Sequence, residues 1–437
     1  LRRNCSGQRN GGYDLSSEHT FLQLNVKLDP LTGKLSVTGN IDFHVNCDAS
    51  TLEFWLHRDL KITELCGANI DSYVCENGEV TMPWMTEAVA LKIKLKHPVS
   101  QDDQVSFSIN YSGCLGIITE WETNRLTPEW VELGLYAPWF PLPTGNALFT
   151  YELVISVSPA SYDLVSSGTV TKGTADGRAC WFVRSVQPVS DIVLLAAPQI
   201  FSSSAGSAGR TEVFYTDRNH EPVAGIIRDT ADKLADYFIG QYQCQESEMD
   251  SGLRIMLAPR SEGGGYVRPG MMVLSEISEA DYCQKEQYYF HWFAHEIAHL
   301  WWYRAPTDCW EDWLNESFAE YAALMAMRDF YGADVFESIL AQKRGKAANT
   351  PGILGLDRNN EAAYQVLYHK GPLVLYELET RMEHHREGSF ASFLQAALKD
   401  QIVSTAQLLD LLTDMAGRED AQWLESKLGA KTLGDEF

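Results

Sequence analysis

The chain has 437 residues and is acidic, because 59 Asp and Glu against 35 Lys and Arg give a formal net charge of -24. This charge argues against nucleic-acid binding, since a surface that contacts phosphates needs a basic field, and it indicates solubility more readily than steering of cationic substrates. With 45% hydrophobic residues and no low-complexity tract, the chain is typical of ordered globular proteins, and its length favours two or three domains.

The first half of the chain has the alternating pattern of β-strands. Between about residues 20 and 200, apolar and polar residues alternate, and turn signals such as DPLTGK separate the strands. The clearest segments are FLQLNVKL (21–28), LSVTGNIDFHV (35–45), VALKIKL (89–95), VSFSINY (105–111) and FTYELVISV (149–157). We therefore expect an antiparallel β domain with one solvated face over residues 1–208.

After this region the alternating pattern of strands gives way to other sequence patterns. The stretch SSSAGSAG (202–209) is small, uncharged and typical of a linker. A short mixed segment comes next, with the strand TEVFYT, a helical pattern over 221–239 and the strands LRIML and MMVL. Beyond residue 284 the pattern is almost entirely helical, so residues 209–437 are predicted to form a second, mostly helical domain.

The stretch HWFAHEIAHLWW (291–302) carries the first candidate site. On a helix His295 and His299 lie one turn apart on one face, so both imidazoles can reach one zinc ion at about 2.0–2.1 Å. Glu296 is rotated by about 100° from them, where it can hold a water at the metal, as the general base of an HExxH motif does. Alone, the motif is suggestive, because two histidines without a third ligand would be interpreted as a buried polar stripe.

The next helical pattern supplies what the motif lacks. WLNESFAEYAALMAM begins at Trp313, and Asn315 is expected to cap this helix. Glu316 in its first turn can face back as a third metal ligand. Glu320, one turn further, can accept the second N–H of a ligating histidine and fix its tautomer. His291 is interpreted as a core histidine or one that supports the site.

Three stretches together carry a resemblance to a known family. HEIAHLWW, WLNESFAEY and YHKGPLVLYELE (368–379) resemble the zinc aminopeptidase superfamily of gluzincins, which includes aminopeptidase N and leukotriene hydrolase. WFPLPTGNALFTYELVIS (139–156) resembles the end of that family's saddle-shaped β domain, so the similarity covers most of the chain. The resemblance implies a multi-domain α+β fold: an N-terminal antiparallel β-saddle domain, then a thermolysin-like, mostly α-helical catalytic domain.

The resemblance also implies a role for each site residue. One Zn²⁺ ion would be held by His295, His299 and Glu316, with Glu296 as the general base. Tyr368 falls on the family's catalytic tyrosine, whose hydroxyl donates to the oxyanion formed when water attacks the carbonyl. Without the zinc motif, Tyr368 would instead be read as an aromatic residue on a helix face.

Two departures from the family pattern affect these expectations. The spacing of sixteen residues between His299 and Glu316 is shorter than usual, so the connecting loop must be shorter. Where the family has a Gly-x-Met-Glu-Asn strand, this chain has GGGYVRPGMMVL (263–274), with Val267 at the place of the amine-binding glutamate and Arg268 at the asparagine. One carboxylate that would bind the substrate's amino group is therefore absent.

Other residues are candidates for binding the substrate. Glu132 falls near the position at which the family projects an acidic or amide residue from the β domain, and an exposed strand residue is the alternative interpretation. Gly264, Gly265 and Tyr266 are further candidates, because glycines let a peptide backbone come close.

We therefore expect a zinc metallopeptidase that releases N-terminal residues from peptides, with a peptide as its partner. Three alternatives stay open: a zinc peptidase of other specificity, a hydrolase of another electrophile such as an epoxide, and a non-catalytic binding module. The presence of both Glu296 and Tyr368 argues against the last of these, because a binding module needs neither a base nor an oxyanion donor.

The compartment and the oligomeric state are not fixed by the sequence. Nine cysteines are scattered without a CxxC pair; Cys66 and Cys75 could close a small loop in an oxidising compartment, and separate thiols are an equal interpretation. No apolar run approaches the ~18 residues of a membrane helix. The chain as given is expected to be soluble, either cytoplasmic or the extracytoplasmic piece of a longer protein.

Overall fold

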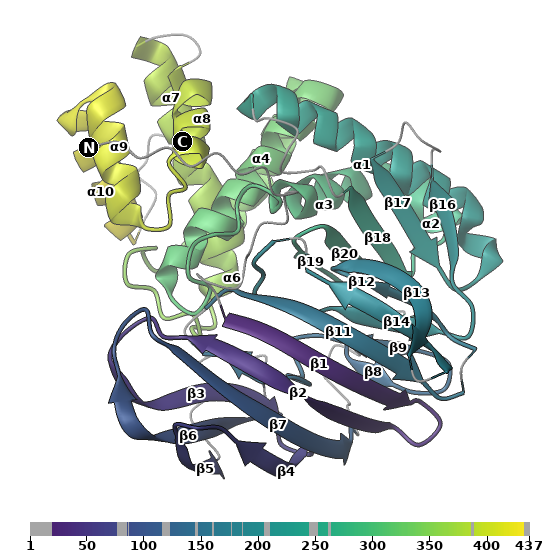
Figure 1. Ribbon diagram of the computed structural model, residues 1–437. Coiled ribbons are helices and arrows are strands. Elements are labelled where there is room, and N and C mark those ends of the chain that lie inside the picture. The colour runs from purple at the N-terminus through teal and green to yellow at the C-terminus, as the bar shows by residue number, and fades with distance from the viewer. Residues whose placement is uncertain are drawn as a thin grey trace, which may run out of the picture. The chain divides into compact units, whose positions relative to one another are not determined.

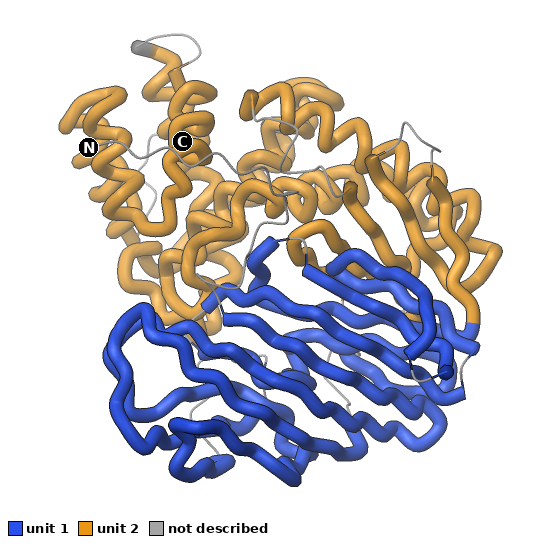
Figure 2. The backbone as a smooth tube through the Cα atoms, in the orientation of Figure 1, with its two compact units in different colours: residues 1–80, 85–118, 124–198 blue, residues 81–84, 119–123, 199–437 orange. Residues whose placement is uncertain are grey.

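The computed structural model describes most of the chain (Figure 1). The described residues are 20–76, 85, 87–115, 123–144, 147–159, 161–175, 177–185, 187–204, 210–243, 252–260, 264–385 and 389–431. The chain divides into two compact units, coloured separately in Figure 2. Unit 1 comprises Leu1–Val80, Met85–Ile118 and Asn124–Pro198, and unit 2 comprises Thr81–Trp84, Thr119–Thr123 and Gln199–Phe437.

Unit 1 is built from three β-sheets. A seven-stranded sheet has the order β13-β14-β11-β1-β2-β7-β4, and two four-stranded sheets have the orders β10-β3-β6-β5 and β12-β15-β9-β8. The strands are β1 (Thr20–Asp29), β2 (Lys34–His44), β3 (Ala49–His57), β4 (Lys61–Cys66), β5 (Ile70–Glu76), β6 (Ala88–Val99), β7 (Gln104–Cys114), β8 (Arg125–Leu126), β9 (Val131–Leu133), β10 (Leu142–Pro143), β11 (Phe149–Val157), β12 (Asp163–Ser166), β13 (Thr169–Ala175), β14 (Arg178–Arg184) and β15 (Leu194–Ala197).

The alternating sequence pattern explains these strands. In β1 the side chains of Leu22, Leu24, Val26 and Leu28 are buried while most of the residues between them are exposed, as a strand with one wet face requires. The pairings described in this unit are antiparallel except for β1 with β11, which run parallel. Periodicity cannot reveal that exception, because it gives the face of each residue and not the direction of the neighbouring strand.

Unit 2 begins with a mixed sheet and continues as helices. The sheet has the order β16-β17-β18-β20-β19, from β16 (Phe201–Ser204), β17 (Thr211–Tyr215), β18 (Leu253–Ala258), β19 (Gly265–Arg268) and β20 (Met271–Ser275). The helices are α1 (Glu221–Tyr242), α2 (Glu279–Gln284), α3 (Glu286–Ala298), α4 (Trp313–Tyr331), α5 (Ala333–Ala347), α6 (Ala363–Gln365), α7 (Gly371–His385), α8 (Ser389–Lys399), α9 (Thr405–Ala416) and α10 (Arg418–Gly429). Short 3₁₀ turns η2 (Arg218–His220) and η4 (Trp310–Asp312) and a π-helical turn η5 (Val366–Lys370) interrupt them.

One apolar core holds unit 2 together and includes the helices that carry the candidate site. Buried residues of α1, α3, α4 and α7 pack with those of the sheet in one cluster. Helix α4 is buried on nearly every side, and its buried residues include the polar side chains Asn315, Ser317 and Glu320 beside the apolar ones. The sheet-rich first part and the helical second part agree with the predicted fold class.

The predicted linker at 202–209 is wrong at its beginning. Ser202, Ser203 and Ser204 belong to strand β16, which pairs antiparallel with β17, because backbone hydrogen bonds to a neighbouring strand outweigh the weak preference of small polar residues for loops. Residues 205–209 lie outside the described residues.

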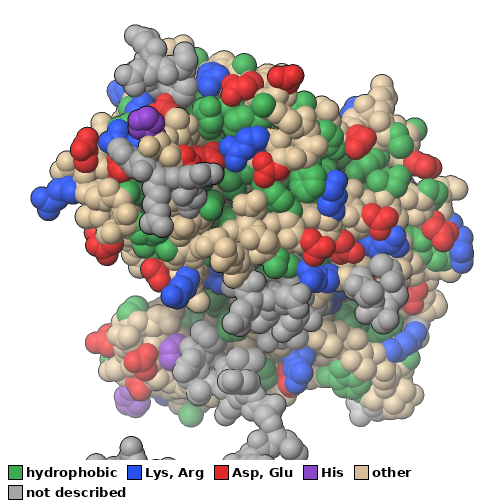
Figure 3. Space-filling view, turned by 90° about the horizontal axis from the view of Figure 1, so that it is seen from above, with side chains coloured by type: hydrophobic (Ala, Val, Ile, Leu, Met, Phe, Trp, Pro, Cys, Tyr) green, Lys and Arg blue, Asp and Glu red, His purple; other side chains and the backbone are tan. Residues whose placement is uncertain are grey.

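The charges on the surface and the hydropathy of the helices bear on whether nucleic acids or membranes are partners. Among the described side chains visible in Figure 3, acidic and basic groups are interspersed, and no broad basic patch is seen. No helix in the described part of the chain is both long and apolar enough to cross a bilayer.

Candidate metal centre

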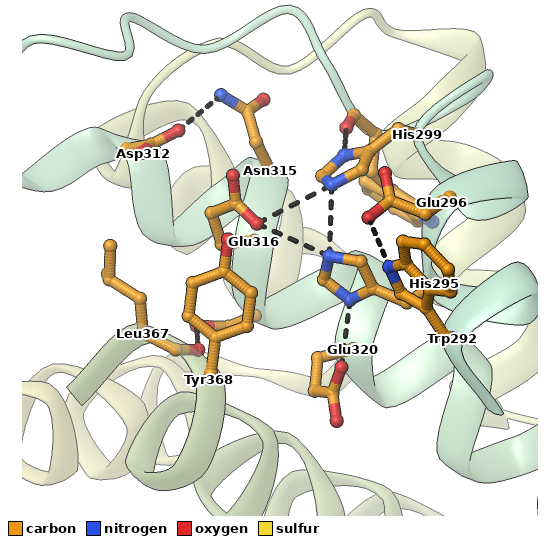
Figure 4. A network of polar contacts seen from close by, with 12 residues as sticks. Trp292, His295, Glu296, His299, Asp312, Asn315, Glu316, Glu320, Leu367 and Tyr368 are labelled. Atoms are coloured by element: carbon orange, nitrogen blue, oxygen red, sulfur yellow. Dashed lines mark hydrogen bonds and ion pairs between the residues drawn. The ribbon is translucent and has the colours of Figure 1, made fainter. Parts of the chain in front are cut away.

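Helices α3 and α4 pack against each other and bring the predicted metal ligands together (Figure 4). His295 lies in the last turn of α3, and Glu316 lies in the first turn of α4. Helix α3 ends at Ala298, so His299 is the residue that caps it, still with helical backbone angles (φ -63°, ψ -11°). The one-turn spacing of the two imidazoles is therefore preserved although the regular helix is shorter than the motif.

The separations between the three donor atoms match one tetrahedral ion. His295 Nε2 and His299 Nε2 are 3.2 Å apart, and Glu316 Oε2 lies 3.5 Å from the first and 3.4 Å from the second. Ligand atoms bound tetrahedrally to zinc at about 2.0–2.1 Å stand about 3.3–3.4 Å from one another. The protein thus holds the three donors at the separation that a zinc ion requires.

The second nitrogen of each imidazole has a partner of its own, which leaves both Nε2 atoms for the centre. His295 Nδ1 lies 2.8 Å from Glu320 Oε2, and His299 Nδ1 lies 2.9 Å from the backbone oxygen of Trp302. Such partners favour a proton on Nδ1 and a lone pair on Nε2. Glu316 Oε2 is buried and faces these two Nε2 atoms at 3.5 Å and 3.4 Å. A cluster of buried lone pairs that face one another fits a cation.

Burial and mutual charges shift the pKa values of the residues in this cluster. Burial by itself would lower the pKa of His295, but its contacts with Glu316 and Glu320 raise that pKa above the ordinary value. Burial would raise the pKa of Glu316, but the charges on His299 and His295 hold it well below the usual range. A metal that binds these groups would therefore displace protons from the histidines.

Glu296 is held beside the donor cluster by a tryptophan of the same helix. Trp292 Nε1 donates a 3.0 Å hydrogen bond to Glu296 Oε1 from one turn earlier. The carboxylate is half-buried and contributes to the electrostatic environment of both histidines and of Tyr368. In Figure 4 it lies on the side of the cluster away from Tyr368, so it is near the centre without contributing a ligand atom to it.

Tyr368 lies on the π-helical turn η5 and faces the centre from the other side (Figure 4). Its ring stacks on His295, with centroids 5.4 Å apart, and on Tyr364, with centroids 4.4 Å apart. Burial and the charge of Glu316 raise the pKa of the Tyr368 hydroxyl well above its ordinary value. The hydroxyl therefore keeps its proton at neutral pH and can act as a hydrogen-bond donor.

The comparisons with known proteins agree with this geometry. Residues 233–427 match the family described as Peptidase family M1 domain. This part of the chain is an M1 peptidase domain. The predictions of the family and of a metallopeptidase are thereby confirmed over these residues, and the predicted zinc cofactor agrees with similar solved structures that are described as zinc metallopeptidases.

Solved structures show that the fold extends over both units. An M1 zinc metallopeptidase from Deinococcus radiodurans is similar at 19% identity with a TM-score of 0.70, covering 96% of this chain and 95% of that one. A variant of it was solved with a Tyr-Ser-Ala substrate. The native yeast LTA4 hydrolase has a TM-score of 0.69 at 16% identity, covering 97% of this chain and 70% of that one. No curated protein sequence matches the chain significantly.

Around the centre of the M1 domain, Glu320 connects several charged groups. Besides His295 it contacts His291, whose Nε2 is 2.9 Å from Glu320 Oε1, and Lys343, whose Nζ is 2.5 Å from the same oxygen. His291 thus supports the site through Glu320, which is one of the two roles that the sequence left open. The sequence did not point to Lys343, because a single lysine on a later helix carries no motif.

The predicted role of Asn315 is wrong. Helix α4 follows the turn η4 directly, and its N-cap position is Asp312, so Asn315 already lies inside the helix. Its side chain binds both backbone polar groups of Ala305, at 3.1 Å and 3.0 Å, and Asp312 Oδ1 at 2.9 Å. Asn315 therefore fastens the loop between the two metal-binding helices to the start of α4, a contact that sequence spacing alone cannot reveal.

The substrate-binding candidates of the M1 domain lie on or beside edge strand β19. Gly264 is exposed and has a positive φ of 57°, and Tyr266 is buried. A Cβ on Gly265 would meet Trp292 Cζ2 at 2.9 Å and Leu274 Cδ2 at 2.6 Å, so a larger residue there would require these side chains to move. Gly263 lies outside the described residues.

The structure excludes one of the two interpretations of Glu132, that of an exposed strand residue. It lies on β9 in unit 1 and is fully buried, and its Oε2 accepts a 3.0 Å hydrogen bond from Trp130 Nε1. The alternative of an exposed strand residue is therefore wrong, while a contact of Glu132 with substrate stays a prediction. Cys66 and Cys75 are both free thiols in the structure, in agreement with the interpretation as separate thiols.

Proposed function

We propose that the protein is an aminopeptidase that hydrolyses the first peptide bond of peptides. His295, His299 and Glu316 bind one zinc ion, Glu296 is the general base, and Tyr368 is the oxyanion donor. The observation that carries the proposal is the set of three mutual distances of 3.2–3.5 Å between the donor atoms, with a carboxylate and a protonated phenol on different sides of them.

The residues divide the reaction between them. Zinc, when bound, acts as a Lewis acid and lowers the pKa of a coordinated water. Glu296 accepts a proton from the attacking water and passes it to the leaving amine nitrogen as the C–N bond breaks. Tyr368 donates a hydrogen bond to the carbonyl oxygen while negative charge develops on it. Glu320 keeps the His295 ring oriented with its Nε2 toward the centre.

The substrate class is supported by the strand beside the centre and by the relatives. Strand β19 is at the edge of its sheet, and Gly264 and Gly265 lie at its start, where an extended peptide could approach its backbone. A related M1 metallopeptidase has been solved with a tripeptide substrate. These observations favour a short peptide as the substrate of this chain.

A second candidate function follows from Val267. This residue is apolar and lies on β19 where the family has a glutamate for the substrate's amino group. Without that carboxylate the chain is a candidate for a zinc peptidase that does not require a free amino terminus. Parallel hydrolysis of one peptide with a free and with an acetylated amino terminus separates the two functions.

The test of the proposed function is a digest of a peptide library. The protein loaded with zinc should shorten peptides one residue at a time from the amino end, and the same preparation should be inactive after chelation and active again after zinc is restored. Internal cleavage, or equal cleavage of acetylated peptides, would support the second candidate. If the zinc-loaded protein cleaves none of the peptides, the peptidase proposal is wrong.

A further inference from the structure

The π-helical turn η5, which carries Tyr368, is bound by side chains from two other helices. A π-helical turn displaces backbone carbonyls from the regular hydrogen-bond ladder, so they need other donors. Ser317 Oγ donates a 2.7 Å hydrogen bond to the carbonyl oxygen of Leu367, and Lys343 Nζ donates a 2.9 Å hydrogen bond to that of Tyr368. Two consecutive carbonyls of the turn are therefore fixed from outside it.

Both donors are connected to the metal centre. Ser317 directly follows the ligand Glu316 on α4. Lys343, on α5, also binds Glu320, which in turn lies 2.8 Å from His295 Nδ1. One buried network thus joins the metal-binding histidine to the backbone of the tyrosine on its other side. Lys343 is only 4% exposed and Ser317 is fully buried, so water does not replace either donor.

We propose that Lys343 is a positioning residue for Tyr368: together with Ser317 it fixes the turn η5 so that the phenol stays directed at the metal centre. The inference rests on the proposed function for the role of the phenol. Neutralising the buried carboxylate of Glu320 would also explain the presence of a buried lysine. That simpler role gives no reason for the second bond to the Tyr368 carbonyl, and it predicts a different result in the following experiment.

A double-mutant cycle between Lys343→Met and Tyr368→Phe separates the two roles. Lys343→Met should lower kcat by about 10- to 100-fold with KM changed by less than about 3-fold, because an oxyanion donor that is misplaced loses most of its effect. In the Tyr368→Phe background the same change should cost less than about 3-fold, since no hydroxyl remains to be positioned. Lys399→Met is the matched control: it removes the same charge from an exposed position on α8 and should leave kcat unchanged.

Two further measurements do not depend on activity. Bound zinc, determined by elemental analysis, should be unchanged in Lys343→Met. The ¹⁹F resonance of a 3-fluorotyrosine in place of Tyr368 should shift or broaden in Lys343→Met and not in Lys399→Met, with or without zinc. Ser317→Ala provides an independent variant with the same expected direction, which matters if Lys343→Met does not fold.

The inference is overturned if Lys343→Met costs the same factor in both backgrounds, or if neither Lys343→Met nor Ser317→Ala changes the fluorine resonance. These outcomes differ from failure of the proposed function, which would appear as a wild-type protein that binds zinc and hydrolyses no peptide. In that case the fluorine resonance still decides whether Lys343 positions Tyr368.

Discussion

The proposed base Glu296 lies beside the three proposed ligands without contributing a donor atom, and its neighbours explain how it does so. It follows the proposed ligand His295 directly in the helix, so its side chain leaves α3 in a different direction from His295 and His299. Trp292 holds one carboxylate oxygen from one turn earlier. The position fits a base that acts on a water at the centre.

Replacing Glu296 by Gln is expected to separate metal binding from catalysis. The amide keeps the size of the side chain but cannot accept a proton, so kcat should fall by about 10²- to 10⁴-fold while one zinc ion per chain is retained. Kinetics and elemental analysis of the same preparation measure both quantities. Glu286→Gln, at the start of the same helix, is the matched control and should retain full activity. Equal activity of the two variants would show that Glu296 is not the base.

Trp292→Phe tests the hydrogen bond that orients the base. Phenylalanine keeps an aromatic ring against Gly265 but removes the N–H that Glu296 accepts. The net contribution of a hydrogen bond to a charged group is about 1.5–3 kcal/mol, and a partial loss of orientation should reduce kcat by about 3- to 10-fold, far less than Glu296→Gln. Steady-state kinetics measure kcat of Trp292→Phe, and Trp423→Phe is the control for the loss of an indole elsewhere in the chain. An unchanged kcat would mean that the carboxylate is positioned without Trp292.

At the level of single residues, the sequence predicts contacts within one helix better than contacts between helices. His295 and His299 share a face because their spacing matches the helical repeat, which needs only local structure. The positions of Asn315 and Lys343 depend on partners that are distant in the chain, Ala305 and Tyr368. No local pattern encodes such pairings, so the sequence assigned a wrong role to the first and none to the second.

The turn η5 also contains a group that should make the protein sensitive to acid. His369 is 7% exposed, and burial together with the charges of Lys343 and Lys346 lowers its pKa from 6.5 to about 4. The folded protein therefore binds this proton less readily than the unfolded chain. Stability from this group is present above the unfolded pKa of 6.5 and is lost as the pH falls toward the folded value of about 4.

The expected loss at about pH 5 is about 2 kcal/mol of the free energy of unfolding. Urea unfolding of the wild type and of His369→Gln at about pH 7 and about pH 5 measures it, because glutamine does not titrate in this range. The variant should lose less stability than the wild type over this interval. An identical pH dependence of the two proteins would show that His369 is not held neutral by the fold.

Among the elements, strands and long helices were predictable where buried side chains recur with a single regular spacing along the sequence. The alternation in β1 gave its buried face, and the helical pattern over 221–239 became α1 over Glu221–Tyr242. The parallel pairing of β1 with β11 and the π-helical form of η5 depend on tertiary contacts, so periodicity could not predict them. The serines of β16 were predicted to belong to a linker because of their composition, and they form a strand instead.

For the whole molecule, the division into two units predicts that zinc stabilises them unequally. The donor atoms come from α3, from His299 directly after it and from α4, and both helices belong to the apolar core of unit 2, whereas unit 1 has its own sheets and contributes none of the three proposed ligands. A ligand that binds only the folded state stabilises it by about 4 kcal/mol when its concentration is about 1,000 times Kd. For a unit of this size that corresponds to a shift in Tm of about 10 °C.

Removal of zinc by a chelator should therefore lower the unfolding temperature of unit 2 and leave that of unit 1 nearly unchanged. Calorimetry measures the midpoints, and hydrogen exchange assigns them: amides of α3 and α4 should lose protection on chelation, and those of β1 and β2 should not. His299→Ala is the control, because with one ligand missing its unfolding should respond little to chelation. Equal loss of protection in both units would contradict the prediction, since it would mean that the three donors stabilise the chain as one cooperative body and not the helical core to which they belong.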